Sequence, residues 1–258
     1  MSTLGTISII AGETLRRSRR RRHLPVLFVV TLGVAGAFSY LTFFGSSRYE
    51  QFFCHIMMLV LPLISVLVAV LTTAWELPGL MADRTVHMML ARPVKRWHVV
   101  AGTYLGVCVT SLAMYCLFVF MFLMALAWRG MGQPPALAHA FVLLGIQVVF
   151  FCALALLMSL LTTPAMTTVV CVFYYCIGQL IQPTLAPKLT NGPMPSRASA
   201  WVMYVVLPHL NYFNLVGPVV HQWPAVPAAA LLPVVLYGLG WSALLVVLAA
   251  VRFEQCEL

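Results

Sequence analysis

The sequence predicts an all-α, polytopic membrane protein, and three observations indicate this fold class. Hydrophobic residues make up 62% of the 258 residues, and charged residues make up only 8%. A soluble domain is charged at about 25% of its positions. The segment 130–187 contains no Lys, Arg, Asp or Glu, although about 20 apolar residues already suffice for one spanning helix. We therefore expect a single transmembrane domain over residues 1–258.

The amino-terminal segment, residues 1–23, is amphipathic and basic. Apolar residues recur at helical spacing from Leu4 to Leu15, which predicts a helix lying in the membrane interface. Six arginines follow between Arg16 and Arg22, as is typical of a cytoplasmic membrane boundary, and they also favour contact with anionic lipids. Because the first apolar stretch begins only after these arginines and is long enough to span, we expect no cleavable signal peptide.

Six apolar segments have about the length of a spanning helix. The turn Thr162-Thr163-Pro164 separates the fourth segment from the fifth. The first two spans fall within 24–74, the next three within 99–185, and the last, with a cytoplasmic tail, within 228–258. In order, the six predicted spans are about 24–44, 53–74, 99–128, 139–161, 165–185 and 228–251.

An external loop, residues 186–227, contains the apolar stretch Trp201–Val216, which Pro208 interrupts. A proline removes a helical hydrogen bond, and non-helical backbone at membrane depth is tolerated only where it is buried in protein or lines water. We therefore predict a re-entrant pair of short helices before the last span. The alternative is a seventh crossing by residues 198–216.

The basic residues orient the six-span arrangement. With the amino terminus inside, 11 of the 15 Lys and Arg residues fall on inner segments and 4 on outer ones. Inner segments of membrane proteins carry such an excess. We expect a multi-pass protein of a bacterial-type inner (plasma) membrane with both termini in the cytoplasm. Since the basic residues lie beside predicted helix ends, we expect membrane lipids and no nucleic acid as partners.

The inner loop, residues 75–98, is the most specific segment. It combines a short helix that has apolar and charged faces, a proline stop and a basic return into the membrane. Such a helix can dock by its apolar side chains into a groove of another protein. The alternative is a solvated loop that only follows the rule of positive inner segments.

Several sequence patterns in and around this loop occur together. The second span ends at the acidic Glu76, followed by a D-R-T step at 83–85 and an L-A-R-P-V turn at 90–94. V-V-A-G-T-Y-L-G, 99–106, then opens the third span, and L-P-H-L-N-Y-F-N occupies 207–214. With the six-span layout, this sequence resembles the permease subunit of type-2 ABC exporters. It is most similar to permeases grouped with copper-enzyme maturation systems, although many members have Lys where this chain has Thr103.

The resemblance implies an exporter of an amphipathic or apolar substrate. Two permease copies, or this chain and a related permease, would pair with two cytoplasmic ABC ATPase subunits that bind ATP and Mg. A coupling helix at about 77–90 would press into the ATPase, and the amino-terminal helix would be the elbow helix. The implied ATPase-coupling residues are Glu76, Leu80, Asp83, Arg84, Met88, Met89 and Leu90.

The residues themselves supply no energy source for transport. The chain has no G-x-x-x-x-G-K-[ST] motif and no carboxylate inside a predicted span, whereas proton and sodium pumps usually carry one. We therefore expect a non-catalytic subunit with no cofactor on this chain. A membrane scaffold, a channel subunit and a lipid-modifying enzyme remain alternatives, but an enzyme needs clustered acids and the six acids here are scattered.

One face of the fifth predicted span is polar. Its members are spaced by 3, 4, 4 and 3 residues, so they share a helix face. This polar stripe consists of Thr168, Cys171, Tyr175, Gln179 and Gln182. It either lines a translocation path at a subunit interface or forms hydrogen bonds between helices, and both roles can coexist.

The sulfur-containing residues form no recognisable site. The seven cysteines show no C-x-x-C pair and no zinc-like spacing, so they are expected to be buried apolar residues. Cys54, His55 and Met57 are soft metal ligands, but they do not form a tight cluster with others. We therefore predict no metal site.

Overall fold

The computed structural model describes residues 3–19, 29, 33, 49–82, 96–128, 130–191, 208–224 and 227–255. All regular secondary structure in these ranges is helical. Four helical segments within them are long and apolar enough to cross a membrane: Gln51–Leu80, Trp97–Trp128, Leu137–Ser159 and Ala229–Gln255. The predicted all-helical membrane character is therefore confirmed, with four spanning candidates in the described part of the chain.

The helices follow the predicted order. Four predicted spans, the second, third, fourth and sixth, fall on the four candidates above, and the fifth falls on α8, which is helical throughout. The first predicted span, 24–44, lies almost wholly outside the described residues. The elements are α1 (Thr3–Arg19), α3 (Tyr49–Ala74), α4 (Glu76–Ala82), α6 (Arg96–Trp128), α7 (Leu137–Ser159), α8 (Pro164–Asn191), η1 (Leu210–Phe213), α10 (Val216–Val220) and α11 (Ala228–Gln255).

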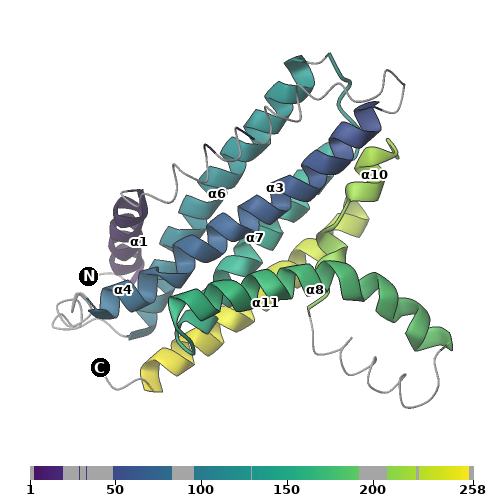
Figure 1. The fold of residues 1–258 in the computed structure, drawn as a ribbon. Helices are drawn as coiled ribbons and strands as arrows, with labels where there is room; N and C mark the ends of the chain where they lie inside the picture. The colour runs from purple at the N-terminus through teal and green to yellow at the C-terminus, as the bar shows by residue number, and fades with distance from the viewer. Residues whose placement is uncertain are drawn as a thin grey trace.

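Successive long helices run in opposite directions along one bundle (Figure 1). Helix α7 packs against α3, α6 and α11, and α8 lies along α3 and α7. The predicted turn at 162–164 joins α7 to α8, where the Thr162 hydroxyl donates to the Met158 carbonyl at 3.0 Å and pairs with the Thr167 hydroxyl at 2.9 Å. These bonds connect the end of α7 to the first turns of α8.

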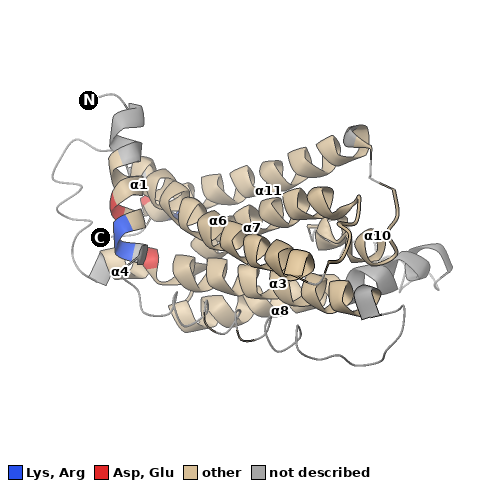
Figure 2. Ribbon diagram, turned by 90° about the horizontal axis from the view of Figure 1, so that it is seen from above, with Lys and Arg blue, Asp and Glu red and all other residues tan. Residues whose placement is uncertain are grey.

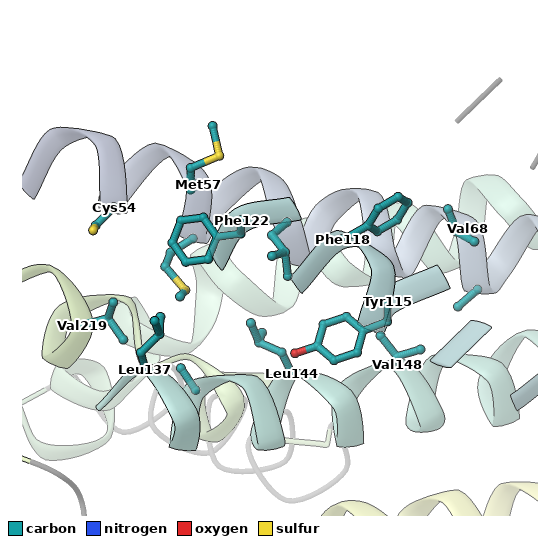
Figure 3. Packing of buried hydrophobic residues seen from close by; sticks show 14 of the residues in the cluster. Cys54, Met57, Val68, Tyr115, Phe118, Phe122, Leu137, Leu144, Val148 and Val219 are labelled. Carbon is teal, nitrogen blue, oxygen red and sulfur yellow. The ribbon is translucent and has the colours of Figure 1, made fainter. Parts of the chain in front are cut away.

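Aromatic and aliphatic side chains fill the space between α3, α6 and α7 (Figure 3). The ring of Phe122 meets that of Phe141 edge to face at 5.9 Å, and the Tyr115 hydroxyl donates to the Phe141 carbonyl at 2.7 Å. The hydroxyls of Thr72 on α3 and Ser111 on α6 lie 3.2 Å apart. Since lipid tails are as apolar as these side chains, close packing and such hydrogen bonds hold the helices together.

Among the described side chains, the charged ones gather at one end of the bundle, together with α1, α4 and the end of α11 (Figure 2). We call this the charged end; its described charged side chains are Glu13, Arg16, Arg17, Glu76, Arg252 and Glu254. Exposed tryptophans lie at helix ends: Trp75 directly precedes α4 and Trp97 lies in the first turn of α6, while Trp128 ends α6 and Trp223 follows α10. Tryptophan is enriched at membrane interfaces in this way.

The length of α6 agrees with this arrangement. Trp97 and Trp128 bracket 32 helical residues, which at 1.5 Å per residue extend over about 47 Å. A bilayer with its headgroup regions is about 40–45 Å thick. A slightly tilted α6 would therefore place one tryptophan in each interface.

Helix α1 is longer than the predicted 4–15 and packs on the first half of α6. The approach is close at Gly106, where a Cβ atom would lie 2.7 Å from the Thr14 Cβ and 2.8 Å from the Ala11 carbonyl oxygen. Only glycine permits this backbone contact. Ile10 and Thr14 are buried in it, while Ile9 and Leu15 are exposed.

Candidate functional site

Two regions contain the residues that the sequence singled out. The first is α4, the short helix that follows α3 at the charged end. The Gly79 amide donates to the Trp75 carbonyl at 3.1 Å, so the helical hydrogen bonding continues across the junction. Glu76 is fully buried in the first turn of α4.

The apolar side chains of α4 are part of the protein's own core. Leu77 is 0% exposed and Leu80 is 3% exposed. They pack in one cluster with Val99 and Val100 of α6 and Phe253 of α11. Residues of α1 and α7 join the same cluster, so α4 and four other helices meet there.

This placement affects the predicted coupling residues differently. Leu80 faces inward and offers no free surface for a partner. The described helix ends at Ala82, whereas the sequence suggested a helix to about residue 90. Residues 83–95 lie outside the described part of the chain, and they include Asp83, Arg84, Met88, Met89 and Leu90.

The second region is the polar stripe on α8. The hydroxyl of Thr168, its first residue, donates to the Pro164 carbonyl of the same helix at 3.0 Å. The second residue, Cys171, is fully buried in an apolar cluster. Tyr175 is buried beside the ring of Phe151, at 5.8 Å between centroids. The side chain of Gln182 lies outside the described residues.

Gln179 connects α8 to the segment before the last span. Its Oε1 accepts a hydrogen bond of 2.9 Å from the Asn214 side-chain amide. The Asn214 Oδ1 in turn accepts the Val216 backbone N–H at 3.0 Å, at the start of α10. One amide therefore fixes both the beginning of α10 and its position against α8.

A cavity of about 280 Å³ lies between α3, α7, α8 and residues 214–216. Its walls are mostly apolar, and its polar side chains are glutamine, asparagine and tyrosine. The lining includes Met58, Pro62, Leu144, Gln147, Tyr175 and Gln179. Two members of the predicted polar stripe, Tyr175 and Gln179, thus face one cavity, whereas Cys171 does not line it.

Gln147 is the polar residue that sequence reasoning missed. It is 1% exposed, and its Nε2 has no hydrogen-bond partner among the described residues. Its only sequence signal is that it interrupts the apolar run between His139 and Ser159 of α7. Burying a side-chain amide without a hydrogen-bond partner costs free energy. The position of Gln147 beside the cavity therefore indicates that a molecule in the cavity could supply the missing acceptor.

The asparagine link predicts a measurable coupling. Asn214→Ala removes both hydrogen bonds and is expected to lower the free energy of unfolding by about 1 kcal/mol, since such bonds in membrane proteins average about 0.6 kcal/mol. Unfolding in mixed micelles of the single variants Asn214→Ala and Gln179→Ala, and of the double variant, isolates the pair. Additive losses would show that the two side chains do not interact.

Comparison with known proteins gives one family match, and it covers both regions. Residues 24–257 match the family described as a protein of unknown function, DUF2705. The chain belongs to this family. A search of curated proteins gave no match. The matched range contains α4, the residues that line the cavity and all of the long helices from α3 to α11.

Proposed function

We propose that this chain is the membrane permease subunit of an ATP-driven exporter, driven at its charged end by a separate cytoplasmic ATPase. The observation that carries the proposal is the way α4 is held. Leu77 and Leu80 fix this helix to α6 and α11 through one buried cluster. A partner that pushes on α4 would therefore move several spans together, because packed interiors transmit displacement.

The direction of the helices supports six spans. Helix α1 lies at the charged end, while α3 begins at the opposite end (Figure 1). In the sequence, the apolar run 24–44 stands between these two helices and is long enough for one crossing. Helix α8 then supplies the fifth crossing, and both termini fall on the charged, cytoplasmic side of a bacterial-type inner membrane.

The segment before α11 supports a re-entrant role. Leu210 and Phe213 of η1 are buried against α7 and α8, and α10 packs on α3 at the end opposite the charged end. The Pro208 carbonyl accepts the Tyr174 hydroxyl at 3.2 Å, so irregular backbone here is supported by protein. Irregular backbone at membrane depth requires this kind of support.

Export of an amphipathic or apolar molecule is the direction we propose, with two permeases and two ATPases in the complex. The chain contributes no nucleotide motif, so ATP and Mg would be bound on the partner. Each ATPase would press on the loop that begins with α4 and ends where α6 begins.

Purification of the complex from the native host tests the proposal. The tagged chain is expected to retain a Walker-type ATPase, and replacing both Met88 and Met89 with Glu is expected to weaken that association at least tenfold, since apolar anchors carry such docking. Replacing both with Leu, which keeps the surface apolar, is the matched control. A complex that lacks an ATPase, or one unaffected by the Glu variant, would overturn the proposal.

A further inference from the structure

The cavity opens onto the outer surface of the bundle between α3 and α8. Leu59 and Leu63, which line it, are 50% and 41% exposed, and Cys176 of α8 is also exposed there. Both leucines lie in a candidate membrane span. In the described part of the chain the mouth therefore faces the hydrocarbon region of the bilayer, and molecules dissolved in lipid can reach it.

The interior of the cavity combines an apolar wall with Gln147 Nε2, a buried donor that has no hydrogen-bond partner among the described residues. Leu144 and Gln147 stand one turn apart on α7, so the chain of a ligand would lie along leucine while the amide donates to a polar atom. Pro62 of α3 also lines the cavity and has no N–H to donate to the Met58 carbonyl. Every lining side chain in the described residues is uncharged, which disfavours an ionised ligand.

We propose that this cavity binds a neutral, single-chain amphiphile that carries a carbonyl or ester oxygen, with Gln147 Nε2 donating a hydrogen bond to that oxygen. The volume of about 280 Å³ lies near the lower end of the range for ligand pockets, so it suits one alkyl chain with a small polar group and excludes a whole phospholipid. The ligand enters sideways from the bilayer and lies between α3 and α8.

This inference goes beyond the proposed function, because it concerns binding by the chain alone and requires no ATPase. If the chain binds the amphiphile but no ATPase associates, the proposed function fails and the ligand site stands. If an ATPase associates but the amphiphile does not bind, the ligand site fails and the proposed function stands. The two failures are therefore distinguishable.

Photolabelling of the purified full chain tests the site directly. The probe is the methyl ester of a ten-carbon fatty acid that carries a diazirine, used in bilayers of ether-linked phosphatidylcholine, a lipid that has no ester carbonyl to compete with it. Label is expected on peptides from the cavity walls of α3, α7 and α8, and excess methyl decanoate is expected to remove it. A diazirine-bearing decane without oxygen is the matched probe, and its labelling of the cavity is expected to be about fivefold weaker, the effect of one hydrogen bond of about 1 kcal/mol.

Two variants separate the amide from the fold. Gln147→Met keeps the volume and is expected to reduce ester labelling to the level of the alkane probe, whereas Ser159→Ala, which removes another buried polar group of α7 outside the cavity, is expected to change nothing. Leu59→Trp at the exposed mouth is expected to block labelling of α7 while leaving the fold intact.

Equal labelling by the two probes, failure of methyl decanoate to compete, or equal behaviour of the Gln147→Met and Ser159→Ala variants would each overturn the proposal. Bilayers of ester-linked lipid then identify the natural source. Labelling that persists there and is still removed by methyl decanoate supports a single-chain amphiphile as the occupant, whereas loss of labelling would show that phospholipid carbonyls occupy the cavity and would overturn the proposal.

Discussion

Valine at position 106 is expected to detach α1 from α6 and to expose the amino-terminal helix to protease. A Cβ at Gly106 meets the Ala11 carbonyl oxygen at 2.8 Å, and this atom belongs to backbone, which cannot rotate away. Thr14 is 2.7 Å away on the same side. Helix α1 must therefore move as a whole, and overpacking of this kind typically costs about 1–3 kcal/mol.

Limited trypsin digestion measures the effect. Cleavage at Arg16 and Arg17 in the Gly106→Val variant is expected to become at least tenfold faster than in the wild type, because a detached α1 loses its packing partner. Gly240→Val is the matched control, since a Cβ at Gly240 of α11 meets no atom within 4 Å. Equal cleavage rates in the two variants would show that α1 does not depend on the contact at Gly106.

The spanning helices could be predicted because the cost of placing charge and unpaired backbone in lipid leaves long uncharged runs. The runs at 99–128 and 139–161 correspond closely to α6 and α7. The ends were less predictable: α11 continues from the predicted Val251 to Gln255, and α1 extends to Arg19. Helical hydrogen bonding continues into the interface, where polar and charged side chains no longer carry a penalty.

The polar stripe on α8 was predicted from spacing alone, and Tyr175 and Gln179 do face one cavity. Their partners could not be predicted, because Asn214 lies 35 residues away from Gln179 and the contact depends on how α8 is rotated against η1. Gln147 was missed for a related reason. Helix α7 is apolar all round, so its sequence carries no signal for which face meets which neighbour.

The short helix α4 shows the limit of sequence reasoning most directly. The resemblance to exporter permeases implied a coupling helix that docks to a partner, and Leu80 was grouped with Met88 and Met89 on that ground. In the structure Leu80 is buried with Val99 and Phe253. Amphipathicity shows that a helix has an apolar face, but it does not show whether that face meets the same chain or another one.

Truncation of Leu80 is therefore expected to destabilise the chain itself. Leu80→Ala should lower the free energy of unfolding by about 2–5 kcal/mol, as for other buried leucines, and Leu80→Glu should prevent accumulation of folded protein, because it buries a charge in an apolar cluster. Leu105→Ala is the control, since Leu105 of α6 is 47% exposed at the same end of the bundle. The free energy of unfolding of the Leu105→Ala variant is expected to change by less than about 1 kcal/mol.

Thermal unfolding followed by size-exclusion chromatography of the detergent-solubilised protein distinguishes the two outcomes. If Leu80→Ala and Leu105→Ala unfold alike, the cluster around α4 does not hold that helix, and the mechanical link on which the proposed coupling rests would be lost. If only Leu80→Ala is destabilised, any loss of ATPase binding in that variant would be explained by unfolding of α4 and would not measure docking. Docking is then tested only with substitutions such as those at Met88 and Met89.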